Sequence, residues 1–118
     1  MERRLHFRVG REAFGVDIKV QSRFPQGENE TDHGWVMDLS EGGMLFSAST
    51  NRASGTPVLL TFNLPDTGIR MICEATIVHS RQDDGESRMG AQFRNLGLAE
   101  RTLLRKCIQK YATGNNEN

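Results

Sequence analysis

Short runs of alternating apolar and polar residues, separated by turn residues, follow one another from residue 14 to residue 94. Alternation with a period of two is typical of strands that bury one face. The runs predict six strands, at residues 14–21, 35–40, 44–47, 58–64, 69–79 and 88–94. Successive short strands with Gly, Pro, Asn and Asp between them favour an antiparallel sheet that closes into a six-stranded barrel.

The periodicity changes at Leu98: from there to Tyr111 the apolar residues recur every three or four positions. This spacing predicts one C-terminal α-helix that covers an open end or edge of the barrel. Its apolar stripe either packs on the barrel or, where it stays exposed, supports assembly of a homo-oligomer, and the sequence leaves both open. Residues 22–33 are polar and carry Pro25 and Gly27, so we expect an exposed loop or a frayed hairpin end there.

The length of 118 residues is that of a single domain. We expect an arginine-rich switch segment at residues 1–12, the barrel with its helix at 13–112, and a disordered tail at 113–118, which has no apolar anchor.

Charge and cysteine usage narrow the function classes. Lys and Arg together number 15, as do Asp and Glu together, so the net charge is zero. The chain therefore has no overall positive charge that would attract nucleic acid or an anionic membrane. No stretch reaches the roughly 20 apolar residues that span a bilayer, and the first residues lack the apolar core of a secretion signal. The two cysteines stand far apart without a CxxC pair, and we interpret them as core residues. We therefore expect a cytoplasmic protein that does not insert into membranes.

Two short motifs carry the chemistry of a site for an anionic nucleotide. The first, at residues 3–8, concentrates arginines, whose planar forks of donors suit phosphates and the acceptor edge of guanine. The second, at residues 38–43, offers the Asp38 carboxylate to guanine donors, the Ser40 hydroxyl, and a close backbone approach at Gly43. Taken singly, the first is typical of a solvated basic terminus and the second of an ordinary hairpin turn.

Together the motifs resemble the PilZ domain, the bacterial receptor module for cyclic di-GMP. The family pattern, RxxxR followed some thirty residues later by [D/N]xSxxG, is met by Arg4, Arg8, Asp38, Ser40 and Gly43. The strand at residues 89–93 and the helix at 103–105 also look like the closing segments of the family, so the resemblance covers nearly the whole chain. It implies a six-stranded barrel with a C-terminal helix.

The resemblance also implies roles for these residues. Arg4 and Arg8 would bind phosphates and guanine acceptors, Asp38 would take guanine donors, Ser40 would bond the same nucleotide, and Gly43 would permit a contact that a Cβ would block. The N-terminal segment would order over the ligand. An arginine just before RxxxR, here Arg3, favours an intercalated pair of cyclic di-GMP molecules per chain.

Other residues receive weaker assignments. The resemblance suggests that His79 or Arg81, at the end of the long strand, flanks a bound guanine. A histidine at a strand end is more often solvated, and Trp35, which opens a strand, is more often a core or barrel-rim residue than a stacking partner.

Three rival functions compete with this interpretation. Asp38, Ser40 and His79 are residue types of a hydrolase triad, but there is no nucleophile-elbow pattern and no metal-ligand spacing, so we expect neither an enzyme nor a metal site. Neutral charge and few aromatics disfavour single-stranded nucleic acid. A PilZ-fold adapter that does not bind the nucleotide is the main alternative. In either case the output would pass to an unidentified protein, and the resemblance points to motility, biofilm formation or virulence.

Overall fold

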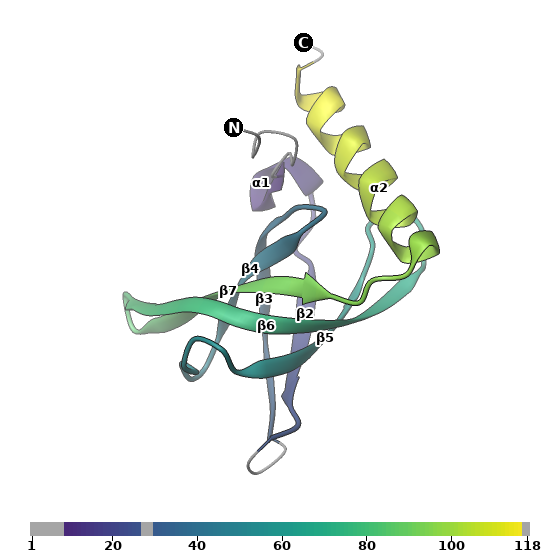
Figure 1. Cartoon of the computed structure of the whole chain (residues 1–118). Helices are drawn as coiled ribbons and strands as arrows, with labels where there is room; N and C mark the ends of the chain where they lie inside the picture. Colours follow the sequence, from purple (N-terminus) through teal and green to yellow (C-terminus); the bar gives the residue numbers. More distant parts are fainter. Residues whose placement is uncertain (1–8, 27–29, 117–118) are drawn as a thin grey trace, which may run out of the picture.

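In the computed structural model of the chain, which describes residues 9–26 and 30–116, antiparallel strands dominate. Its elements, in chain order, are β1 (Val9–Gly10), α1 (Arg11–Phe14), β2 (Lys19–Phe24), β3 (Glu30–Leu39), β4 (Gly43–Ala48), β5 (Pro57–Asn63), β6 (Arg70–Asp83), β7 (Glu86–Arg94) and α2 (Leu98–Asn116) (Figure 1). Both helices lie at the same end of the strands.

The strands from β2 to β7 close into a barrel. They follow the order β3-β2-β5-β6-β7-β4, and the pairing of β4 with β3 completes the ring. The two residues of β1 add to the edge of β3. Closure satisfies the backbone groups of every edge of such a sheet. The predicted six-stranded antiparallel barrel with one C-terminal helix is confirmed.

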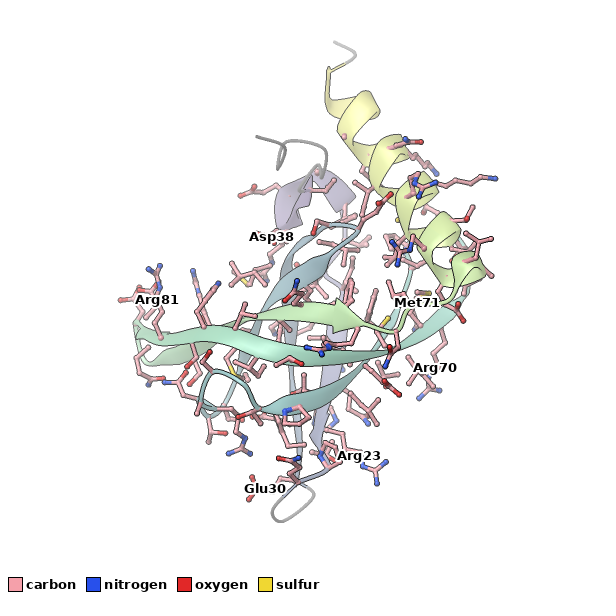
Figure 2. All side chains as sticks on the ribbon, in the orientation of Figure 1. Arg23, Glu30, Asp38, Arg70, Met71 and Arg81 are labelled. Atoms are coloured by element: carbon pink, nitrogen blue, oxygen red, sulfur yellow. The ribbon has the colours of Figure 1, made fainter. Side chains whose placement is uncertain are left out.

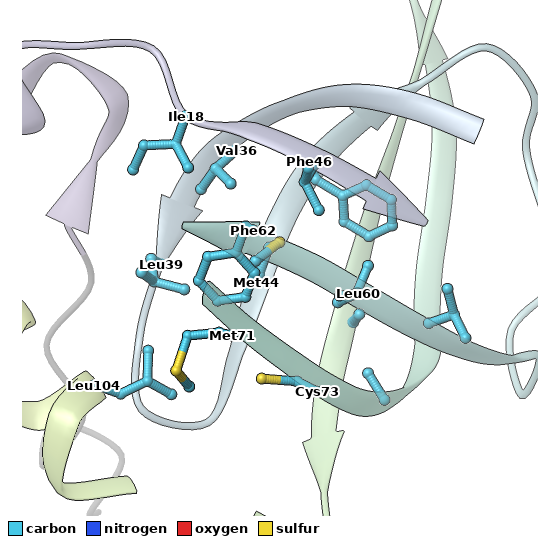
Figure 3. Close-up of a cluster of buried hydrophobic side chains, with 14 of the residues drawn as sticks. Ile18, Val36, Leu39, Met44, Phe46, Leu60, Phe62, Met71, Cys73 and Leu104 are labelled. Carbon is cyan, nitrogen blue, oxygen red and sulfur yellow. The ribbon is translucent and has the colours of Figure 1, made fainter. Parts of the chain in front are cut away.

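The inward faces of the strands form one apolar core (Figure 3). Phe46, Leu60 and Ile77 are fully buried in it, each at a position where the alternation predicts an inward side chain. From α2, Leu104 and Ile108 join the same core, so the apolar stripe of the helix packs on the end of the barrel. Burying one leucine side chain of this kind contributes about 1.5–3 kcal/mol.

Both cysteines belong to this core, as the sequence predicts. Cys73 on β6 and Cys107 on α2 are buried and free. Burial raises the pKa of the Cys73 thiol to about 11, so the thiol stays protonated at neutral pH. None of the described helices is both long enough and apolar enough to cross a membrane.

The prediction of the first strand at residues 14–21 was wrong in its start. Residues Arg11–Phe14 form the single helical turn of α1, Gly15 ends it at a φ of 73°, and β2 begins only at Lys19. The cause is a tertiary contact between α1 and α2. The ring of Phe14 packs edge-on against Tyr111 of α2, with 4.9 Å between the ring centroids, and this contact needs the turn.

The expected exposed loop at residues 22–33 was also too long. β2 continues to Phe24 and pairs with β3 from Glu30, which leaves only a hairpin connection between them. Ser22 and Asp32 are polar residues that the fold nevertheless buries. Burial of the Asp32 carboxyl opposes its ionisation. Hydrogen bonds from the Ser49 hydroxyl and from backbone N–H groups outweigh burial and hold the Asp32 pKa below its ordinary value.

β6, β7 and α2 also exceed their predicted lengths. β6 and β7 extend beyond the predicted ends and meet at a tight turn in which Asp84 and Gly85 both have positive φ. The final helix runs past the Tyr111 expected from the pattern and ends at Asn116. The proposed division of the chain at residues 12 and 112 remains a prediction.

Candidate functional site

A pocket of about 310 Å³ opens on the outside of the barrel where three strands run side by side. The end of β3 and the β3–β4 turn form one wall, and the adjacent strands β4, β7 and β6 form the remainder. Its lining consists of Asp38, Ser40, Gly42, Gly43, Met44, Leu45, Val78, His79, Gly90, Ala91 and Gln92. The pocket therefore contains every predicted site residue of the second motif, together with His79.

Ser40 stabilises the turn through both its backbone N–H and its side-chain hydroxyl. Its N–H donates to the Gly43 carbonyl at 2.9 Å, and its hydroxyl donates to the same carbonyl at 3.3 Å. The hydroxyl oxygen also accepts from the N–H groups of Gly42 and Gly43, at 3.3 and 3.2 Å. Serine hydroxyls stabilise turns in this way. The sequence interpretation assigned the hydroxyl to the ligand and missed this role.

Gly43 is required by a close approach of two strands. A Cβ on this residue would lie 2.1 Å from the backbone carbonyl oxygen of Ala91 on β7. Neither Gly42 nor Gly43 has a positive φ. The absence of a side chain at Gly43, and not its backbone angle, lets β4 pair with β7.

Asp38 sits where β3 is irregular. The register of β3 against β4 shifts between Val36 and Asp38, so Met37 is an extra residue on the β3 side. Bulges of this kind re-aim the neighbouring side chain, and Asp38 is one of the residues that line the pocket. On its other side β3 pairs with β1, with Gly10 opposite Asp38 and Val9 opposite Leu39.

This last pairing relates the two motifs to each other. Val9, which directly follows the first motif in the chain, lies beside Leu39 of the second motif. The predicted site residues Arg3, Arg4 and Arg8 themselves lie outside the described residues.

His79 and Arg81 have different surroundings. A second register shift, between Ile77 and His79, places His79 opposite Gly90, and both residues line the pocket. Arg81 is not among the lining residues. Its side chain is 72% exposed and forms an ion pair of 3.5 Å with Asp83 near the tip of the β6–β7 hairpin (Figure 2).

Sequence reasoning missed Gly90, Gln92, Leu45 and Val78 as lining residues. One of them left a signal: an isolated glycine inside a strand pattern, here Gly90, often marks a close approach of another group. The other three are ordinary strand residues, and nothing in their local sequence sets them apart.

The pocket combines a carboxylate, an imidazole, the Gln92 amide and the apolar side chains of Leu45 and Val78. Such a mixture suits a planar heterocycle with hydrogen-bonding edges. Within residues 9–26 and 30–116 there is no group of three or more His, Cys, Asp or Glu side chains that could hold a metal ion.

Comparisons with known proteins agree with this architecture. The family model described as "PilZ domain" matches residues 2–110. The PilZ domain with c-di-GMP of YcgR from Escherichia coli is similar in fold, with a TM-score of 0.76 and 20% sequence identity over 98% of this chain and 96% of that one. No curated protein sequence matches the chain.

Two longer proteins contain the same fold. The Bacillus subtilis inhibitor of motility, MotI/DgrA, has a TM-score of 0.77 and 19% identity, covering 100% of this chain and 55% of that one. The MrkH–c-di-GMP complex of K. pneumonia has a TM-score of 0.77 and 15% identity, covering 100% of this chain and 56% of that one. The chain thus spans about half the length of these two proteins.

Proposed function

The chain belongs to the PilZ domain family, and we propose that it is a receptor for cyclic di-GMP that binds the nucleotide between its N-terminal arginines and the pocket beside the β3–β4 turn. The observation that carries the proposal is the pairing of β1 with β3, because it brings the residue after Arg8 next to Leu39 of the second motif. That several structural relatives are complexes with c-di-GMP supports the same ligand.

Each motif residue has a role that its chemistry allows. Arg4 and Arg8 bind phosphate oxygens and guanine acceptors. Asp38 accepts hydrogen bonds from guanine nitrogens at the wall of the pocket, while Ser40 and Gly43 keep that wall in shape. His79 flanks the base from β6. Arg3 offsets the charge of a second, intercalated cyclic di-GMP molecule.

Binding is expected to order the N-terminal segment. Charge-assisted hydrogen bonds contribute about 1.5–3 kcal/mol each, and several of them offset an ordering cost of about 1–2 kcal/mol per residue. The segment leads through β1 into α1, and α1 contacts α2 through Phe14 and Tyr111. We propose that this route relays the ligand signal to a cytoplasmic protein partner.

We expect the pocket to bind its ligand without converting it to a product. The Ser40 hydroxyl donates to a carbonyl of its own turn, and this occupies the proton that a neighbouring base would have to remove. Incubation with cyclic di-GMP followed by chromatography should return intact ligand. Linear dinucleotide formed above the level of a Ser40→Ala control would contradict this part of the proposal.

Isothermal titration with cyclic di-GMP tests the receptor function. The wild type should bind saturably, with a stoichiometry near two ligands per chain, and Arg4→Ala/Arg8→Ala should lose at least a hundredfold in affinity. Arg70→Ala/Arg101→Ala is the matched control, because it removes two exposed arginines of β6 and α2 that do not line the pocket. A stoichiometry near one would contradict the intercalated pair. No binding by the wild type would favour the PilZ-fold adapter.

A further inference from the structure

We propose that Gly90 is a positioning residue, which leaves room for the His79 imidazole to lie across β7 as the floor on which a purine of the ligand stacks. The inference rests on the proposed receptor function and extends it to a residue that neither motif contains.

The geometry places His79 over Gly90. The two residues are directly opposite each other in the β6–β7 pairing. A Cβ on Gly90 would lie 2.3 Å from His79 Nε2, 2.6 Å from Cε1 and 3.0 Å from Cδ2. Real Cβ atoms do not approach other atoms so closely, so the outer edge of the ring occupies the space that any side chain at position 90 would need.

The register around Gly90 explains why the ring faces the pocket. Ala91 pairs with Ile77, and both are buried in the core. Because side chains alternate along a strand, position 90 faces outward. The bulge at Val78 then turns His79 to the same outward face.

Gly90 also lies on the middle one of the three paired strands that line the pocket. It pairs with His79 of β6 on one side and with Leu45 of β4 on the other, and all three residues line the pocket. The ring therefore extends over the middle strand toward an apolar side chain. A flat aromatic surface next to a leucine is the kind of platform on which purine bases stack.

The nature of the collision makes the proposal testable. A methyl group at Gly90 meets the far end of a flexible side chain, which can swing away while the backbone stays in place. We therefore expect Gly90→Ala to keep the barrel folded and to displace only the ring.

A double-mutant cycle of cyclic di-GMP affinity tests whether Gly90 acts through His79. Gly90→Ala should weaken binding about tenfold in the wild type, which is the size of one lost stacking contact, and less than twofold in a His79→Ala background. Gly97→Ala is the matched control, because its methyl group meets only the end of the Glu100 side chain, outside the pocket, and it should leave affinity unchanged. An equal loss in both backgrounds would overturn the proposal.

The ligand-free protein supplies a second readout. In the wild type, nuclear Overhauser effects should join the His79 ring protons to the Gly90 Hα protons, and Gly90→Ala should abolish the contact with residue 90 while leaving the backbone spectrum of the core unchanged. Persistence of the ring contact in that variant would overturn the positioning role. If the wild type binds no cyclic di-GMP, the receptor function and the stacking role both fail, and this measurement still decides the position of the ring.

Discussion

Glu41 and Arg105 form an ion pair that joins the β3–β4 turn to α2, with Arg105 Nε 2.5 Å from Glu41 Oε2. Glu41 lies inside the second motif, between Ser40 and Gly43, while Arg105 comes 64 residues later in the chain. One wall of the pocket and the C-terminal helix therefore share a direct contact. Both side chains are partly exposed, so the contact is expected to couple their positions more than to stabilise the fold.

The energy of this ion pair should be small and sensitive to salt. In a double-mutant cycle of Glu41→Gln and Arg105→Gln, urea denaturation should give a coupling of about 0.2–1 kcal/mol, which shrinks in 1 M salt. Lys106→Gln, an exposed cation on the same helix, serves as the control and should show no coupling to Glu41. Equal coupling for both helix residues would mean that the effect is general electrostatics.

Gly43→Ala should destabilise the barrel by about 1–3 kcal/mol, the usual cost of overpacking. The added methyl group would meet the backbone carbonyl of Ala91, which cannot move without breaking the β4–β7 pairing. Gly10→Ala is the control, because nothing lies within 4 Å of its Cβ position. Denaturation midpoints that shift equally in the two variants would show that loss of glycine, and not the collision, is responsible.

Ser40→Ala should lower the free energy of unfolding by about 1 kcal/mol, because the hydroxyl satisfies two backbone N–H groups of the turn. Ser54→Ala removes an exposed hydroxyl with a single hydrogen bond to the Val78 carbonyl, and it should cost less. Thermal unfolding by circular dichroism measures both. If Ser40→Ala is as stable as the wild type, the Ser40 hydroxyl does not stabilise the turn, and its role would be confined to ligand binding.

Asp32 should make stability depend on pH in the acid range. Its folded pKa lies below the ordinary value of 3.8, so the ionised carboxylate contributes stability above that value, and the contribution is lost as the pH falls through the folded pKa. Asp32→Asn should flatten the decline in unfolding free energy below about pH 4. Ser49→Ala removes one of the donors and should flatten it partially. An unchanged decline in both variants would contradict this origin.

Local periodicity predicted most of the elements. β5 lies within one residue of its predicted ends, and α2 begins at Leu98 as the change of rhythm indicates. β5 is a short run rich in apolar and β-forming residues between turn residues, and α2 has a helical apolar pattern, so each can be recognised without information from elsewhere in the chain. The two motifs were equally visible, because their residue types and spacing are written in the sequence.

The elements that the sequence did not predict depend on distant partners. Phe14 ends a helical turn because Tyr111 packs against it, and Asp32 is buried because Ser49 and Thr50 donate hydrogen bonds to it. Neither partner is apparent from the residues nearby. Polar residues such as Asp32 look like loop residues until a partner is supplied.

By itself, then, the sequence determined the class of fold, the strands with regular alternation, the helix, and the residue types of the second motif that the pocket contains. Only the tertiary structure decided why Gly43 must be a glycine and how His79 comes to lie over Gly90, because the first relationship joins β4 to the distant β7 and the second depends on the bulge at Val78 in the β6–β7 pairing. Their geometry follows from the register and bulges of strand pairing, which closure of the barrel sets and which local periodicity does not encode.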